Sequence, residues 1–420
     1  MMFKKDSSRM TERQEQIKYW VIQACYFLTG ALFLSIYTAH TYVPAVLLLI
    51  SLPLIIKRDV YSTLSRDNQL YLMISVSFVL VQYISIFLDG GRIRDFDHPS
   101  RVLMGAAVFI LCLQYPPRFL WLMVGVSTGA IGAGIRAIWG CYFSGEVRAF
   151  EHQMNAIQGG DISMTLGLLS LCGVMWAIKK SYHLYAIFFT IAAGMGVIGS
   201  ILSQSRGGWI LLPVIPFIIY KICSDWFSKR LKTGLLCIFC LLIIFCLTPQ
   251  SSIPQRFAIA GQDITLYFSG GTKDTSTGKR IENWKSALDS FVQKPLFGWG
   301  KHGVLKSRDQ QLLNGSLGKA AHEYADAHSQ YLDELAKRGI IGFAALLALF
   351  LYPLYIFIKG LKVHVGPESR TFAACGIVLV LSTMGYCLTQ SFLNHYSGMI
   401  FYSVFVVFFI SAGSNKVEIA

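Results

Sequence analysis

Long apolar runs separated by short polar segments recur along the whole chain. A helix needs about 20 apolar residues, at a rise of 1.5 Å each, to cross a hydrocarbon core of about 30 Å. The runs therefore predict about twelve membrane spans. They lie near Lys18–Tyr37, His40–Ile56, Leu70–Leu88, Val102–Tyr115, Phe119–Trp139, Ile162–Ile178, Leu184–Leu202, Trp209–Cys223, Thr233–Leu247, Ile340–Ile358, Thr371–Leu388 and Tyr396–Ala412. The predicted fold is an all-α, polytopic transmembrane helical bundle.

Basic residues collect in every second gap between the apolar runs, as Lys179 and Lys180 do after the sixth. Lysine and arginine accumulate on the cytoplasmic side of membrane proteins, so these gaps and both termini are predicted to be cytoplasmic. The gap after the third run is also basic, with Arg92, Arg94 and Arg101, and would favour the opposite orientation. The larger number of basic gaps supports cytoplasmic termini.

The longest polar segment then faces the outside of the membrane. Apolar residues at helical spacing predict two amphipathic helices in it, Arg280–Phe291 and about Ala320–Arg338, joined by a glycine-rich turn at Pro295–Gly303. These helices are expected to form a helical periplasmic cap on the bundle. The predicted division of the chain is 1–247 for spans one to nine, 248–339 for the large periplasmic loop, and 340–420 for spans ten to twelve.

Composition agrees with a membrane protein, because 54% of the 420 residues are hydrophobic and only 14% are charged. Soluble domains carry about 25% charged residues. The formal net charge of +14 would suit a nucleic-acid partner, but most of it falls in short loops, where membrane insertion requires it. We therefore expect a lipid bilayer and no nucleic acid as partner. The histidines follow no metal-binding spacing, so neither a metal nor a cofactor is predicted.

Arg206 stands in the segment Ser203–Trp209, where two glycines precede the eighth span. An arginine, accessible backbone amides and a helix N-terminus together can bind a diphosphate. The alternative is an interfacial arginine that extends its charge to water. Arg280 begins a predicted helix, where a cation opposes the helix dipole. That placement favours a binding role over the alternative of a solvated surface arginine.

His328 lies on the apolar stripe of the second predicted cap helix. Histidine accepts protons near neutral pH, so it could act as a base. The alternative is a hydrogen-bonded core residue, which is the commoner role for a histidine in such a position. His302 and His322 are competitors that look more exposed by their pattern.

Two further positions lie near the predicted outer ends of spans. Arg136 is a charge inside an apolar run, which makes it a functional candidate. Asn394 and His395 occupy a very short outer connection and could line the same cavity as Arg136. Capping of the neighbouring helices is the alternative for these two residues.

Three groups of motifs surround the large loop in a fixed order. They are Ser205–Trp209, then Arg280–Trp284 with Phe297–Gly300, and then Ala327–Leu332 followed by Arg338–Gly342. In this order and spacing the chain resembles the O-antigen ligase and polymerase superfamily of bacterial envelope glycosyltransferases. The architecture is similar over the whole chain, and the short motifs over about a third of it.

The resemblance implies a GT-C-like fold in the Gram-negative inner membrane, with the active site facing the periplasm. It implies inverting, metal-independent transfer of O-antigen polysaccharide from undecaprenyl diphosphate to a sugar hydroxyl of the lipid A–core, without a cofactor. Arg206 and Arg280 would hold the diphosphate, and His328 would activate or position the acceptor hydroxyl. The family usually has asparagine where this chain has Ser329, which leaves the role of that position open. The substrate-binding residues expected around these three are Arg136, Gly207, Gln330, Tyr331, Arg338 and His395.

Three alternatives to a ligase remain. An O-antigen polymerase is the closest of them. A protein O-oligosaccharyltransferase is less favoured, because many of these enzymes carry an added C-terminal outer region. A transporter of lipid-linked sugar would show paired halves and ionisable residues at the middle of the membrane, and such residues are nearly absent from the predicted spans.

Overall fold

The computed structural model describes residues 2–62, 64–210, 213–229, 232–233, 252–324, 326–363 and 366–414. Every regular element within these ranges is a helix, as predicted. Nine described helical stretches are long and apolar enough to cross a membrane, and Ala39–Ile55 is a shorter apolar helix. The chain is therefore a multi-pass helical membrane protein.

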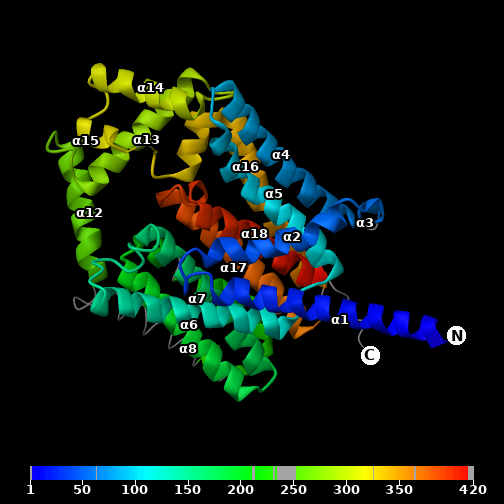
Figure 1. Ribbon diagram of the computed structural model, residues 1–420. Coiled ribbons are helices and arrows are strands. Elements are labelled where there is room, and N and C mark those ends of the chain that lie inside the picture. Colours follow the sequence, from blue (N-terminus) through cyan, green and yellow to red (C-terminus); the bar gives the residue numbers. More distant parts are fainter. Residues whose placement is uncertain are drawn as a thin grey trace.

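The helices fall into a bundle and a cap at one end of it (Figure 1). The bundle contains α1 (Met2–Ala31), α2 (Ala39–Ile55), α3 (Arg58–Ser62), α4 (Arg66–Leu88), α5 (Ile93–Gln114), α6 (Phe119–Phe143), α7 (Ala156–Lys179), α8 (His183–Ser203), α9 (Arg206–Ile210), α10 (Val214–Cys223), η1 (Ser224–Trp226), α16 (Gln330–Val363), α17 (Pro367–Thr389), η2 (Phe392–Asn394) and α18 (Tyr396–Ser414). The cap contains α12 (Ser252–Phe268), α13 (Ser276–Gln293), α14 (Gly300–Leu313) and α15 (Lys319–His322).

All predicted spans except the ninth overlap described helices, although α1, which contains most of the first, is not among the nine counted above. The ninth, Thr233–Leu247, lies outside the described residues apart from its first position. Several spans differ in detail. Helix α1 ends at Ala31, before the predicted Tyr37, and α7 begins at Ala156, before the predicted Ile162. The fourth starts at Ile93, well before the predicted Val102, and the eighth is divided into the short α9 and the later α10.

The most buried helices of the bundle are α7, α17 and α18, which form its centre. Small residues bring neighbouring helices close to them. A methyl group at Gly167 of α7 would lie 2.9 Å from the Ala193 carbonyl of α8, so the two backbones pack at a distance that only glycine permits. Close packing of small residues is the usual way in which membrane helices associate.

The cap has a small core of its own, made by Ala287, Val304, Ala327 and Ala336. Its remaining interior is polar. The buried guanidinium of Arg308 donates to the Asn283 side chain and to the Ala321 carbonyl, both at 2.8 Å. Hydrogen bonds of this kind satisfy a charge that would otherwise be costly to bury, so Arg308 holds α13, α14 and α15 together.

Asp89, directly after α4, fixes the cap to the bundle. Its carboxylate accepts hydrogen bonds from the backbone amides of His302 at 2.6 Å and Gly303 at 3.1 Å. These amides belong to the first turn of α14, where the helix leaves donors unsatisfied and favours negative charge. The cap is thus anchored to the end of α4.

The prediction of one cap helix from Ala320 to Arg338 is wrong. Helix α15 ends at His322, and α16 begins only at Gln330. His328, between them, has a positive φ of 49°, which a continuous right-handed helix does not allow. The apolar stripe on which the prediction rested continues through this break. The first predicted cap helix is confirmed, but it begins at Ser276, so Arg280 lies in its second turn.

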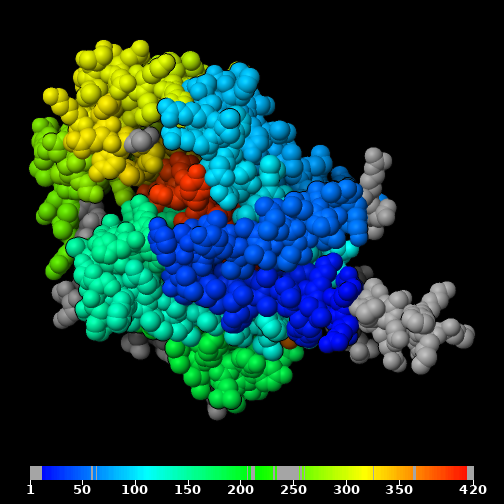
Figure 2. Space-filling view, viewed as in Figure 1, coloured from blue at the N-terminus to red at the C-terminus, as the bar shows by residue number. Residues whose placement is uncertain are grey.

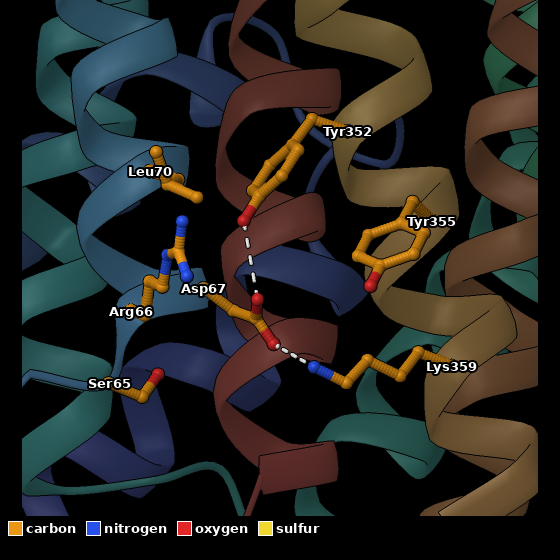
Figure 3. Close-up of a pocket in the computed structure, with 7 residues that line it drawn as sticks. All are labelled: Ser65, Arg66, Asp67, Leu70, Tyr352, Tyr355 and Lys359. Carbon is orange, nitrogen blue, oxygen red and sulfur yellow. Dashed lines mark hydrogen bonds and ion pairs between the residues drawn. The ribbon is translucent and has the colours of Figure 1, made fainter.

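A separate pocket lies at the other end of the bundle, between the start of α4 and the end of α16 (Figure 3). Lys359 pairs with Asp67 at 2.7 Å, and the Tyr352 hydroxyl donates to the same carboxylate at 3.4 Å. This pair joins α4 to α16 on the side away from the cap. Its lining residues are Ser65, Arg66, Asp67, Leu70, Tyr352, Tyr355 and Lys359.

Candidate functional site

His328 lies in the turn between the cap and the first residue of α16. Its backbone amide donates to the Asp326 carboxylate at 2.9 Å, and its ring nitrogen Nδ1 is 3.5 Å from the same oxygen. The imidazole packs edge-on against the Tyr324 ring at 4.7 Å between centroids. Its side chain is 29% exposed. The turn therefore holds the imidazole on two sides and leaves part of it open to solvent or a ligand.

Arg280 and His328, predicted as site residues from separate parts of the loop, are close enough to interact electrostatically. Burial is the main reason why the pKa of His328 is lowered, the Asp326 carboxylate opposes this, and the Arg280 guanidinium lowers the pKa further. Arg308 of α14 acts in the same direction as Arg280. The lowered pKa favours the neutral form of His328, which is the form that can accept a proton.

The Arg206 turn approaches the same region from the bundle. Helix α9, which begins at Arg206, packs against α7 and α17. A methyl group at Gly207 would lie 2.9 Å from the hydroxyl of Thr389, the last residue of α17. The Ser329 hydroxyl donates at 3.5 Å to the carbonyl of Cys387, in the same turn of α17. The end of α17 thus lies between the Arg206 turn and the His328 turn.

A buried carboxylate stabilises the Arg206 turn. The Ser205 hydroxyl donates to Asp161 of α7, and Gly208 donates its backbone amide to the same side chain. Asp161 is 1% exposed, and its second oxygen has no partner among the described residues. The glycines allow α9 to approach α7 and α17 closely, so Gly207 has a clear packing role. Its predicted part in substrate binding stays a prediction.

The start of α16 is tied to the connection between α17 and α18 by a buried polar network. Gln330 accepts from the Leu393 amide at 3.0 Å and donates to the Asn394 side chain at 3.1 Å. Asn394 donates to Asp333 at 2.8 Å, and Lys337 pairs with the same carboxylate at 2.6 Å. Because these groups satisfy one another in a buried setting, they fix the backbone immediately after His328.

The other predicted substrate-binding residues of this region also have partners within the protein. The Tyr331 hydroxyl donates to the Met384 carbonyl at 2.9 Å. Arg338 pairs with buried Glu334 at 2.9 Å, although its buried Nε has no hydrogen-bond partner within the described part of the chain. His395 lies close enough to Asp326 for that carboxylate to raise its pKa, against a larger lowering by burial. These residues border the site, and their contacts with substrate stay predictions.

Arg136 lies in a separate cluster. Its Nη2 pairs with Glu146 at 2.6 Å, and the Glu146 side chain is completely buried. The other oxygen of Glu146 accepts the backbone amide of Phe150 at 2.8 Å. Arg136 therefore links α6 to the loop that follows it. The two alternative histidines have carboxylate partners elsewhere. Nδ1 of His302 lies 3.1 Å from the Asp89 carboxylate, and Nε2 of His322 lies 2.8 Å from the Asp309 carboxylate.

Figure 2 shows a hollow on this face of the molecule. Its rim is formed by the yellow cap, the cyan start of α5 and the segments coloured blue and teal from the first half of the chain. Atoms of the red C-terminal part are visible at its floor.

Sequence reasoning missed three charged residues of this site. Asp326, Arg308 and Asp333 all act on His328, and they come from the turn itself, from α14 and from α16. Asp326 is only two residues from His328, so its proximity was available as a signal. The contribution of Arg308 depends on how α14 folds against α13, which no local pattern indicates.

Comparison with known proteins agrees with these observations. Residues 188–347 match the sequence model of a family described as O-antigen ligase. The matched range runs from α8 into α16, so it contains Arg206, Arg280 and His328. An uncharacterized protein of Haemophilus influenzae is 29% identical over 391 residues, which covers 93% of this chain and 97% of that protein.

The family match supports a glycosyltransferase-like membrane enzyme with a ligase- or polymerase-type function in lipopolysaccharide biosynthesis. It also implies lipid-linked polysaccharide substrates and a membrane environment. The match confirms the resemblance drawn from the motifs over residues 188–347, where the chain is similar to the family described as O-antigen ligase.

Proposed function

We propose that this protein is an O-antigen ligase that transfers polysaccharide from undecaprenyl diphosphate to a sugar hydroxyl of the lipid A–core. The observation that carries the proposal is the arrangement of the two turns around the end of α17. Ser329 contacts Cys387, and Gly207 lies beside Thr389, so the Arg206 and His328 backbones border the same short segment. Arg280 adds a second cation near His328.

The groups in this arrangement match the needs of an inverting displacement. The acceptor hydroxyl attacks the anomeric carbon while the bond to the diphosphate oxygen breaks, and the hydroxyl proton passes to His328. A lowered pKa keeps His328 neutral and able to accept that proton. Arg206 and Arg280 stabilise the charge that develops on the departing diphosphate, since fixed charges act most strongly where charge appears in the transition state.

The proposed periplasmic location of the site rests on charge and topology. The basic gaps lie on the side predicted to be cytoplasmic. In Figure 1, α1 begins and α18 ends on the side of the bundle away from the cap. Cytoplasmic termini would therefore put the cap in the periplasm, where the lipid-linked polymer and the lipid A–core meet.

A deletion strain tests the proposed function. Loss of a ligase leaves lipid-linked polymer intact but unattached to the lipid A–core, which gel electrophoresis of lipopolysaccharide detects. Single repeat units on the core would instead identify a polymerase, and lipid-linked substrate retained on the cytoplasmic face would identify a transporter. Either result would contradict the proposal.

Complementation of that strain tests the assigned residues. We expect Arg206→Ala and His328→Ala to lower transfer at least about 100-fold, the lower end of the effect of removing such groups. Lys279→Ala, beside Arg280 on α13, serves as a control and should restore capped lipopolysaccharide. Immunoblots of membranes establish that every variant accumulates. Near-normal capping by the Arg206 and His328 variants would refute these roles.

A further inference from the structure

The backbone of His328 is held in a conformation that only a few residues adopt. Its φ of 49° lies in the left-handed region, which disfavours residues with a side chain. Such strain persists only where neighbouring interactions hold it, and it concentrates at functional sites. Asp326 supplies the holding interaction, because its carboxylate oxygen accepts the His328 amide at 2.9 Å. The same oxygen is 3.5 Å from Nδ1 of the imidazole.

Asp326 also acts on a second histidine. His395 lies between η2 and α18, and the charge of Asp326 raises its pKa while burial, the larger effect, lowers it. Asp326 therefore acts electrostatically on a histidine of the cap turn and on a histidine of the bundle. Its side chain is 32% exposed, so part of its charge remains solvated.

We propose that Asp326 is a positioning residue, which directs Nδ1 of His328 toward its carboxylate and leaves Nε2 as the nitrogen that takes up the acceptor proton. This inference rests on the proposed function. In the transfer step the acceptor oxygen forms its bond to the anomeric carbon, and the diphosphate departs with the electrons of the broken bond. The proton of the acceptor passes to Nε2, while Nδ1 keeps its hydrogen beside Asp326. The resulting imidazolium is stabilised by that carboxylate and then loses a proton to solvent.

The pH dependence follows from every charged group that faces His328. Asp326 in the turn and Asp333 of α16 raise its pKa, whereas burial, Arg280 of α13 and Arg308 of α14 lower it. Removing the charge of Asp326 removes one of the two interactions that favour the protonated form. The pKa of His328 must then fall further, and the acidic limb of the activity profile must move to lower pH. A residue with only a structural role would not move that limb.

The test uses the purified full chain in liposomes, with Asp326→Asn, Asp326→Glu and a matched control. The control is Asp309→Asn, because Asp309 also pairs with a histidine of the cap, His322, at 2.8 Å but does so at the exposed surface. We expect Asp326→Asn to lower kcat about 10- to 100-fold. This loss is smaller than the loss expected on removing the general base itself. KM should stay within about two-fold. Asp326→Glu should restore much of kcat, and Asp309→Asn should match the wild type.

A second readout does not depend on turnover. Diethylpyrocarbonate modifies neutral imidazole, so mass spectrometry of modified His328 across pH gives its protonation midpoint. The midpoint should fall in Asp326→Asn and stay unchanged in Asp309→Asn. An unchanged midpoint together with wild-type kcat would overturn the inference about Asp326. Absence of transfer by the wild-type protein would instead overturn the proposed function, and the midpoint would still decide the role of Asp326.

Discussion

Arg136 illustrates how a functional candidate in an apolar run can also serve the fold. Its side chain is 24% exposed and pairs with a Glu146 side chain that is fully buried. Glu146 also accepts the Phe150 amide, so this carboxylate organises the loop after α6. Removing one partner of a buried ion pair leaves the other charge uncompensated, which costs about 3–5 kcal/mol.

We therefore predict that Arg136→Ala destabilises the folded protein. Seven free cysteines are described and six of them are buried, so a thiol-reactive dye can report unfolding of the purified protein on heating. Arg136→Ala should melt at a lower temperature, and Arg136→Met with Glu146→Met should recover much of the loss because both charges are gone. His152→Gln is the control, since His152 lies 3.6 Å from Glu146 but is 60% exposed. A variant that melts normally yet fails to transfer would favour the predicted substrate role.

At the scale of elements, two glycines join the cap to the membrane part of α16. Gly339 kinks α16 with φ 62° and ψ −158°, a region open essentially to glycine alone. A methyl group there would lie 2.4 Å from the Leu296 carbonyl, and one at Gly298 would lie 2.3 Å from the Lys337 carbonyl carbon. The Ile340 amide, freed by the kink, donates to the Pro295 carbonyl at 2.8 Å. The glycine turn and the kink are therefore interlocked.

Gly339→Ala should consequently disrupt the fit between cap and bundle. We expect a loss of at least about 1–3 kcal/mol from the backbone conformation, and more from the clash. Gly315→Ala is the matched control, because Gly315 also has a positive φ, of 75°, but nothing lies within 4 Å of an added methyl group. The same dye assay compares them. Equal melting temperatures for the two variants would contradict the interlock.

These elements also explain what sequence patterns can predict here. A span must stay apolar over many residues, so α4, α8, α17 and α18 could be located from hydropathy within a few residues. The break before α16 could not be located from hydropathy, because the apolar spacing continues across it. The backbone changes direction there at His328, whose amide donates a hydrogen bond to Asp326.

Only part of the candidate site could be predicted from the sequence. Arg206, Arg280 and His328 stand out through local motifs. The buried network of Asp333, Lys337 and Asn394 joins segments far apart in the chain, so it becomes visible only after folding.

At the scale of the whole molecule, the site lies at the seam between cap and bundle. The cap supplies Arg280 and the His328 turn, and the bundle supplies the α9 turn and the end of α17. Under the proposed function, a lipid tail stays in the membrane beside this seam while its diphosphate and sugar reach the polar side. Intact, membrane-embedded protein is therefore the proper material for a test.

The most direct measurement is transfer by the purified protein in liposomes that contain lipid A–core and undecaprenyl-diphosphate-linked O-antigen. With a chelator present and no nucleotide added, the account predicts polysaccharide attached to the lipid A–core by wild-type protein, and at least about 100-fold less with His328→Ala. Longer polymer on undecaprenyl diphosphate, or equal transfer by the His328 variant, would contradict it.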